Sequence, residues 1–183
     1  IMFGLNMIVN KGKTVFVGDT SVHEYPSSEQ LAEIALSSAR VVRLFGFDPK
    51  VAFVSHSTFG QPLTSRTKHI KNAVDILKGK DVNFKFDGDM QPDVALNDQY
   101  KELYPFSEIV GNANILIMPG QHSAAISYKM MRELGGAKVI GPLLIGLGQP
   151  IEIAPLRSST SDILNLASVA AYSAGVISYN KKN

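Results

Sequence analysis

The sequence predicts an α/β fold with three layers, in which an open mixed sheet carries helices on both of its faces. Strand-length apolar runs alternate with segments in which apolar residues recur every three or four positions, and this alternation is typical of α/β domains. The runs at residues 51–55 and 115–118 are apolar almost without interruption, which indicates strands covered on both faces. With 183 residues, 45% of them hydrophobic, the chain has enough apolar material for one core, so we expect one domain over residues 1–183.

Seven segments rich in Val, Ile and Phe have the length and composition of strands. They are Met2–Val9, Thr14–Val17, Val51–Ser55, Asn83–Phe86, Ile115–Met118, Val139–Ile145 and Ile151–Ala154. The first two are joined by Asn10–Lys13, a turn sequence that suits a hairpin at one edge of the sheet. Such a hairpin would make the sheet mixed.

Helical periodicity appears between most of these strands. Apolar residues recur with a period of about 3.6 over residues 31–45, 70–77 and 126–134. A last helix is expected over about Thr160–Ser178. Ser27 with Gln30, and Ser159 with Asp162, have the spacing of capping boxes, so the first and last helices should begin next to these pairs.

Composition excludes several classes of protein. The formal net charge is only +2 and the basic residues are scattered, which argues against a nucleic-acid partner. The absence of cysteine excludes disulfides and thiolate metal sites, and it favours a reducing compartment, so we expect a cytoplasmic protein. The longest apolar stretch, Val139–Leu147, is far shorter than the ~20 residues of a membrane-spanning helix, so no membrane partner is expected.

No standard cofactor motif is present. Gly146–Ile151 lacks the third glycine of a dinucleotide fingerprint, and the chain has no phosphate-binding P-loop motif. Asp87, Asp89 and Asp93 have carboxylates suited to a divalent cation, but a turn followed by a helix cap is the favoured interpretation. We therefore assign no catalytic residue, metal ligand or cofactor to this chain.

The loop Ser55–Gly60 is the first candidate ligand site. It follows a buried strand, and ligands of open α/β sheets bind at the carboxyl ends of the strands. The hydroxyls of Ser55, Ser57 and Thr58, together with backbone N–H groups, could hold a phosphate group. The alternative is a hydroxyl-rich loop that caps a helix.

The second candidate site is the segment Arg157–Asp162, which opens the last helix. The guanidinium of Arg157, the hydroxyls of Ser158 and Ser159 and a helix N-terminus would stabilise an anion there, with Asp162 close by. The alternative is that Ser159 and Asp162 only cap the helix.

Four stretches of the chain share their order and spacing with a known family. They are Pro49–Gly60, Asp87–Leu96, Ala113–Gly120, and Gly141–Leu147 followed by Ser161–Leu166. Together they resemble the phosphate acetyltransferase (phosphate acetyl/butyryltransferase) family, and more closely the homologous domain at the C-terminus of bacterial NADP-dependent malic enzymes. The resemblance extends over nearly the whole chain.

The resemblance implies a fold like that of isocitrate and isopropylmalate dehydrogenases, with two α/β domains and a ligand cleft between them. The chain is similar to the second of these domains plus the C-terminal helix. We therefore expect it to be a fragment of a longer polypeptide, an expectation that the strand-like start without an initiator methionine also favours. Part of any CoA or acyl-phosphate site would then lie outside the chain.

One segment separates the two branches of the family. Active acetyltransferases carry Ser-Arg-Gly followed by an Asp; here Asp162 matches that Asp, but Pro155–Arg157 takes the place of Ser-Arg-Gly. The serine is lost, and the arginine is lost or displaced to Arg157. One lost donor beside a developing oxyanion can cost on the order of 10² to 10³ in rate. The loop Ser55–Gly60 also lacks the lysine of the acetyltransferases.

Three functions are consistent with this pattern. The favoured one is a regulatory and oligomerising domain that responds to acetyl-CoA or a related acyl-CoA. In that case the missing domains of the same chain would bind NADP and Mg²⁺ or Mn²⁺ and convert malate to pyruvate, and the protein would be a homodimer or a higher homo-oligomer. The alternatives are an active phosphate acetyltransferase and a purely structural dimerisation domain.

Overall fold

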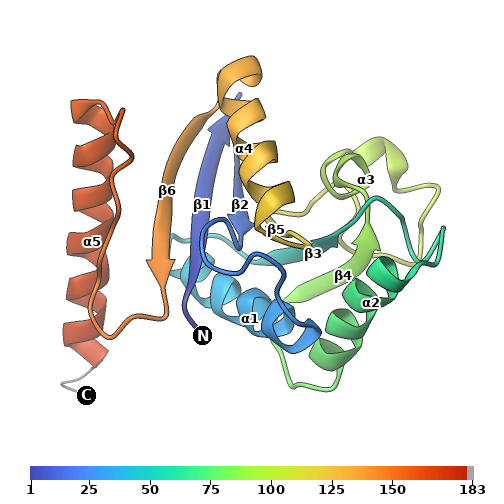
Figure 1. The fold of residues 1–183 in the computed structure, drawn as a ribbon. Helices are drawn as coiled ribbons and strands as arrows, with labels where there is room; N and C mark the ends of the chain where they lie inside the picture. The colour runs from blue at the N-terminus through green and yellow to red at the C-terminus, as the bar shows by residue number, and fades with distance from the viewer. Residues whose placement is uncertain (181–183) are drawn as a thin grey trace.

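A six-stranded mixed sheet forms the centre of the molecule (Figure 1). The computed structural model describes residues 1–180, with side chains described to residue 175. The strands are β1 (Phe3–Asn10), β2 (Lys13–Gly18), β3 (Lys50–Val54), β4 (Lys85–Met90), β5 (Ile115–Ile117) and β6 (Lys138–Ile145). Their order is β4-β3-β5-β2-β1-β6; β2, β5, β3 and β4 run parallel, and β1 is antiparallel to both of its neighbours.

Helices cover both faces of this sheet, as the sequence predicts. They are α1 (Ser28–Leu44), α2 (Ser65–Lys78), α3 (Pro92–Leu96), α4 (Gln121–Gly135) and α5 (Thr160–Asn180), with a 3₁₀ turn at Asp98–Tyr100. The first two pack on one face around Phe3, Phe16 and Phe53. Helices α3 and α4 pack on the other face around Val17 and Met90. The three-layer prediction is confirmed (Figure 1).

Helix α1 illustrates how local sequence and burial act together. The capping box is present: the Ser27 N–H donates to the Gln30 side chain at 2.7 Å, and the Gln30 N–H donates to Ser27 Oγ at 3.2 Å. Eight residues of the helix are buried, Leu31 and Ile34 among them. Each such aliphatic side chain contributes about 1.5–3 kcal/mol by leaving water, so burial outweighs the cap.

The predicted hairpin is present but does not lie at the edge of the sheet. Lys11 and Gly12 form its turn with φ of 48° and 78°, the left-handed conformation that two-residue hairpins require. The edge position was wrong, because β6 pairs with β1 from Phe3↔Ile145 to Val9↔Lys138. This pairing joins segments more than 120 residues apart, and no local turn signal reports it.

The seventh predicted strand, Ile151–Ala154, is not formed. The segment keeps one isolated bridge, between Leu143 and Glu152, and otherwise leaves the sheet. Pro150 and Pro155 stand on either side of it, and proline has no N–H to donate to a ladder. The segment is therefore an extended connection to α5, which packs beside β6 and buries Leu166.

Helix α4 is present where predicted, but most of its apolar stripe faces outward. Ile126, Met130 and Leu134 are 57%, 54% and 82% exposed. The face turned to the sheet contains Ala124, the one residue of α4 that is buried, with Tyr128 and Met131 packed beside it. Among the described residues no helix has the length and apolar character needed to cross a membrane.

Candidate functional site

A cleft at the carboxyl ends of β3 and β5 is the strongest candidate ligand site. We call it the strand-end cleft; its volume is about 590 Å³. Ser55 and His56 line it after β3, and Met118–Gly120 lines it between β5 and α4. The segment Glu24–Tyr25 and the first turns of α2 complete its walls. Parallel strands of an open α/β sheet end at this position, where ligands of such sheets bind.

The polar groups of the strand-end cleft suit an anion. Arg66 from α2 and the imidazoles of His56, His69 and His122 line it. The His69 ring is fixed, because its Nε2 lies 2.8 Å from the Pro26 carbonyl oxygen and its plane stacks on Tyr25. No side chain caps the N-terminus of α4, so its partial positive charge faces the same space. The other His69 nitrogen, Nδ1, lies 3.1 Å from Ser28 Oγ, and His122 lies 3.5 Å from the Glu24 carboxylate. The cleft can therefore supply the Arg66 guanidinium, the His56 imidazole and backbone donors to one phosphate-bearing ligand.

Sequence reasoning did not find Arg66, His69 or His122. A signal for part of this set was present, since His56 and His122 each follow a strand of the parallel part of the sheet. Arg66 and His69 lie on α2, and only the packing of α2 against β4 and α1 brings them to the cleft.

Only one of the three predicted hydroxyls of the 55–60 loop lines the strand-end cleft. That residue is Ser55. Ser57 is fully buried and donates its hydroxyl to the Asp89 carboxylate, while Thr58 Oγ1 accepts the Gln91 N–H at 3.2 Å. The hydroxyls of Ser57 and Thr58 therefore hold the loop in place.

Asp89 anchors this loop from strand β4. It is 1% exposed, and its carboxylate accepts the Gly60 N–H at 2.9 Å in addition to the Ser57 hydroxyl. The predicted turn at residues 87–89 is wrong, because Asp87–Asp89 continues the strand beside β3. The predicted cap before α3 is also absent, since Gln91 occupies the cap position without a side-chain bond.

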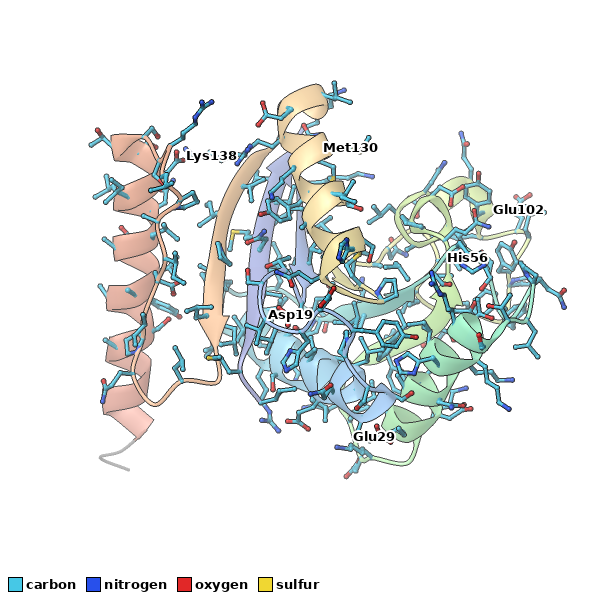
Figure 2. The ribbon with its side chains drawn as sticks, viewed as in Figure 1. Asp19, Glu29, His56, Glu102, Met130 and Lys138 are labelled. Atoms are coloured by element: carbon cyan, nitrogen blue, oxygen red, sulfur yellow. The ribbon has the colours of Figure 1, made fainter. Side chains whose placement is uncertain are left out.

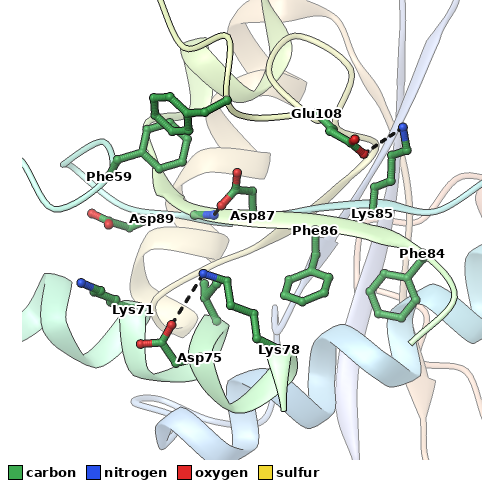
Figure 3. A pocket seen from close by; sticks show the side chains of 13 residues that line it. Phe59, Lys71, Asp75, Lys78, Phe84, Lys85, Phe86, Asp87, Asp89 and Glu108 are labelled. Atoms are coloured by element: carbon green, nitrogen blue, oxygen red, sulfur yellow. Dashed lines mark hydrogen bonds and ion pairs between the residues drawn. The ribbon is translucent and has the colours of Figure 1, made fainter. Parts of the chain in front are cut away.

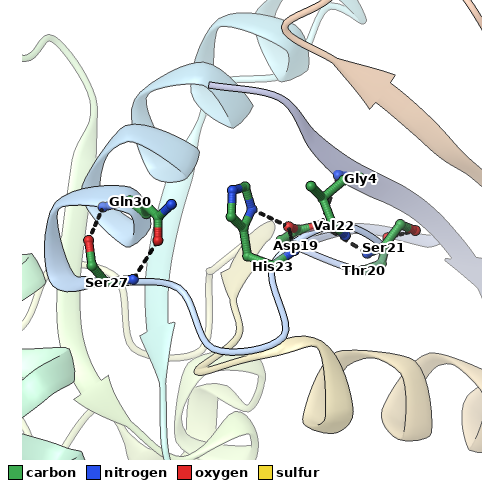
Figure 4. Close-up of polar contacts among 8 residues, drawn as sticks. All are labelled: Gly4, Asp19, Thr20, Ser21, Val22, His23, Ser27 and Gln30. Carbon is green, nitrogen blue, oxygen red and sulfur yellow. Dashed lines mark hydrogen bonds and ion pairs between the residues drawn. The ribbon is translucent and has the colours of Figure 1, made fainter.

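A second buried carboxylate, Asp19, anchors the opposite wall of the cleft (Figure 4). Asp19 is 1% exposed and accepts backbone N–H groups from Gly4, Ser21, Val22 and His23 at 2.8–3.2 Å. The His23 ring nitrogen Nδ1 lies 2.7 Å from its second oxygen. The turn fixed in this way leads directly into Glu24 and Tyr25, which line the strand-end cleft.

The second predicted site lies in a different groove, which we call the Arg157 groove. It has a volume of about 420 Å³ and lies between α4, β6 and the start of α5. Arg157 and Ser158 line it with two cations that sequence reasoning missed, Arg132 and Lys138. Lys138 Nζ is 3.8 Å from the Asp162 carboxylate, so part of this positive charge is already paired.

The hydroxyls beside Arg157 mostly serve the helix start. Asp162 accepts the Ser159 N–H at 3.0 Å and the Ser159 hydroxyl at 2.7 Å, which forms the predicted capping box. These hydrogen bonds from Ser159 hold the pKa of the Asp162 carboxyl below its usual value. Ser158 donates its hydroxyl to the Pro155 carbonyl at 2.7 Å. Of the residues predicted for this site, Arg157 is therefore the one whose side chain stays available to a ligand.

The fold does not bring the two predicted sites together. The strand-end cleft and the Arg157 groove share no lining residue. His56 and Lys138, which mark the two places, lie on opposite sides of the molecule in Figure 2. Ser55 and Arg157 therefore belong to two separate candidate sites.

A third groove, of about 650 Å³, follows the free edge of β4 (Figure 3). Its lysines are largely neutralised by neighbours: Lys85 pairs with Glu108 at 3.0 Å and Lys78 with Asp75 at 3.7 Å. The groove therefore has less unpaired positive charge to bind an anion than the strand-end cleft has. Within residues 1–180, no group of three or more His, Cys, Asp or Glu side chains gathers that could hold a metal ion.

The ionisation of Glu152 makes the stability of the folded chain depend on pH near neutrality. Its carboxyl faces a small apolar pocket between β6, α1 and α5, and its Oε2 is buried without a hydrogen-bond partner. Burial raises the pKa of Glu152 to about 7, and a backbone hydrogen bond at Leu144 opposes the shift in part. The folded state thus binds a proton more tightly than the unfolded chain does.

We expect Glu152→Gln to raise the melting temperature at pH 8 and to leave it nearly unchanged at pH 4.5. The stabilising contribution of the protonated native carboxyl is complete below its unfolded pKa of about 4.5 and is lost as pH rises through about 7. Thermal melts across this pH range measure the difference, with exposed Glu102→Gln as the matched control. An equal effect at both pH values would show that Glu152 is solvated in the folded protein.

Comparison with known proteins defines the family. The family model described as phosphate acetyl/butaryl transferase matches residues 1–171, so the chain belongs to this family. An NADP-dependent malic enzyme of Rhizobium meliloti (strain 1021) is 47% identical over 174 residues, which are 95% of this chain and 23% of that protein. A phosphate acetyltransferase of Bacillus subtilis (strain 168) is 34% identical over 166 residues, covering 90% of this chain and 51% of the relative.

The fold comparison agrees with the sequence comparison. A phosphotransacetylase from Streptococcus pyogenes superposes with a TM-score of 0.90 and 30% identity over 95% of this chain and 54% of that one. The resemblance to the phosphate acetyltransferase-like domain of NADP-dependent malic enzymes is confirmed. The chain spans less than a quarter of the malic enzyme's length and about half that of the phosphate acetyltransferase.

Proposed function

We propose that this chain is a regulatory and oligomerising domain of an NADP-dependent malic enzyme, and that it binds acetyl-CoA or a related acyl-CoA. In this proposal the protein is cytoplasmic, and the conversion of malate to pyruvate, with NADP and Mg²⁺ or Mn²⁺, belongs to regions outside the chain. The 47% identity to a malic enzyme over 95% of the chain supports the parent assignment. The proposed binding of an acyl-CoA is argued from the clefts of the domain.

The observation that carries the proposal is the donor set of the strand-end cleft. Coenzyme A has a pyrophosphate, a further phosphate on its ribose, and a long arm in which methylene groups alternate with two amides. The cleft combines Arg66, the His56 imidazole and the α4 N-terminus with apolar walls such as Ile70 and Met118. Charged hydrogen bonds would hold the phosphates, and the apolar walls would cover the arm. Ser55 adds a hydroxyl at the end of β3.

We expect Arg66→Ala to weaken acetyl-CoA binding by roughly tenfold to a hundredfold, because hydrogen bonds to charged groups contribute about 1.5–3 kcal/mol. Arg157→Ala is the matched variant: it removes the same charge from the other groove that the sequence indicates. Isothermal titration of both variants locates the site. A loss confined to Arg157→Ala would move acyl-CoA to the Arg157 groove, and no binding by the unsubstituted chain would refute the proposal.

Regulation requires more than binding. An acyl-CoA can shift assembly only if its affinity differs between two assembly states. Light scattering of the chain at fixed protein concentration, with and without saturating acetyl-CoA, measures this difference. A change in mean mass would support the regulatory role, and an unchanged mass with clear binding would contradict it.

A second candidate, transfer of acetyl groups between CoA and phosphate, is favoured by the similarity to phosphate acetyltransferases. Pro155 and Leu156 stand where that family has Ser-Arg, and proline supplies no donor. Acetyl phosphate formed from acetyl-CoA and phosphate above the rate without protein would support this candidate over the regulatory one.

A further inference from the structure

The small pocket that contains Glu152 lies where α1, β6 and α5 meet, and we call it the Glu152 pocket. Its volume is about 150 Å³. Much of its wall belongs to the main core cluster or packs against it, namely Val41, Phe45, Leu143, Ile145 and Val169. The pocket is therefore an apolar extension of the core that opens beside α5.

The Glu152 carboxyl is the acceptor in this pocket that lacks a partner. A backbone hydrogen bond at Leu144 reaches the carboxyl, but Oε2 is buried and has no hydrogen bond within the described part of the chain. Among the described lining residues, α1 and β6 contribute no titratable side chain, and α5 contributes Tyr172. The Tyr172 hydroxyl is already used, because it donates to the Leu44 carbonyl oxygen at 2.8 Å. A bound molecule that brings its own donor can therefore satisfy Oε2.

We propose that the Glu152 pocket binds a small apolar amine, with the ammonium group on Glu152 Oε2 and the hydrocarbon part against the core. A hydrogen bond between an ammonium and a carboxylate is about twice as strong as a neutral one. A carboxylate ligand would be repelled, and a hydrocarbon would leave Oε2 without a donor. Glu152 as a whole is only partly buried, which moderates the cost of desolvating the ion pair. An apolar cavity of about 150 Å³ accepts a molecule as large as benzene.

The bound amine would fasten α5 to the sheet. Of the described residues of α5, Leu166 alone is buried, and the segment before this helix keeps one bridge to the sheet, between Leu143 and Glu152. A ligand in the pocket contacts α1, β6 and α5 at once, since all three line it (Figure 1). Binding should therefore slow amide hydrogen exchange in α5.

Isothermal titration of the chain with benzylamine tests the site. We expect a dissociation constant of about 1 mM at pH 8, as for a ligand of this size. Benzylamine stays cationic at pH 6, but Glu152, whose pKa is about 7, then takes up a proton, so the affinity should fall about tenfold. Benzyl alcohol has the same shape without the charge and should bind at least about tenfold more weakly at pH 8.

Two variants locate the amine. Glu152→Gln keeps the shape of the side chain and should weaken benzylamine binding at pH 8 about tenfold, with no remaining difference between pH 6 and pH 8. Exposed Glu102→Gln is the matched control and should change neither value. Val169→Phe should fill the pocket and abolish binding while Glu152 stays in place. Benzylamine should slow exchange in α5 of the unsubstituted chain and of Glu102→Gln, but not in Val169→Phe.

Three results would overturn the inference. No heat of binding at benzylamine concentrations well above the expected dissociation constant would mean that the pocket takes no amine. Binding that is unchanged in both Glu152→Gln and Val169→Phe would place the amine elsewhere. Equal affinity for benzyl alcohol would remove the role of the carboxylate. The pocket shares no lining residue with the strand-end cleft or the Arg157 groove, so these results are independent of acetyl-CoA binding.

Discussion

Asp19→Ala is expected to lower the free energy of unfolding by about 3 to 5 kcal/mol, the largest effect we predict for a single substitution in this chain. The carboxylate is buried and accepts four backbone N–H groups and the His23 ring. Its removal leaves the buried Gly4 N–H and the partly buried donors of the turn without an acceptor, and each buried unsatisfied donor costs about 1–3 kcal/mol. Because water partly solvates the freed donors, the total loss of unfolding free energy is smaller than the sum of these individual costs.

Urea denaturation measures this loss, and Asp48→Ala provides the control because Asp48 is exposed. The same variant should bind acetyl-CoA more weakly even at low temperature, where it remains folded, because Asp19 positions the turn that leads to Tyr25. If the urea midpoint of Asp19→Ala equalled that of the unsubstituted protein within experimental error, other contacts would hold the turn.

Asp89→Ala should lower the free energy of unfolding by about 2 to 4 kcal/mol. Here the buried carboxylate accepts the Ser57 hydroxyl and the Gly60 N–H, so fewer donors lose their partner than at Asp19. A buried charged group with good hydrogen bonds also stabilises more than a neutral one. The 55–60 loop should become mobile, and the Gly60 amide should exchange its hydrogen faster.

The neighbouring carboxylate supplies the control for Asp89. Asp87 lies in the same strand, two residues away and only partly buried, and it accepts one N–H, that of Gly88. Asp87→Ala should therefore cost less than half as much in urea denaturation. If the two substitutions were equally destabilising, the loss would come from strand β4 rather than from the loop that Asp89 anchors.

The candidate site was only partly predictable from sequence. Ser55 could be placed because a buried strand ends immediately before it, and the strand direction follows from the α/β alternation. The roles of Ser57 and Asp89 could not, because they are 32 residues apart and meet only through the β3–β4 pairing. Arg66 could not be predicted for the same reason, because it reaches the cleft only through the packing of α2.

By itself, the sequence determined those features whose causes lie within a few neighbouring residues. The capping boxes at Ser27 and Ser159, the hairpin turn at Lys11 and Gly12 and the alternation of strands and helices are local, because hydrogen bonds and periodicity between adjacent residues set them.

The tertiary structure alone decided what depends on distant partners. It placed β6 against β1, put Ser55 and Arg157 in separate clefts and left Ile126, Met130 and Leu134 of α4 exposed. Periodicity shows that a helix has an apolar face, but burial of that face depends on which elements pack against it. In this chain Met131 of the predicted apolar pattern packs towards the sheet, whereas Ile126, Met130 and Leu134 stay exposed.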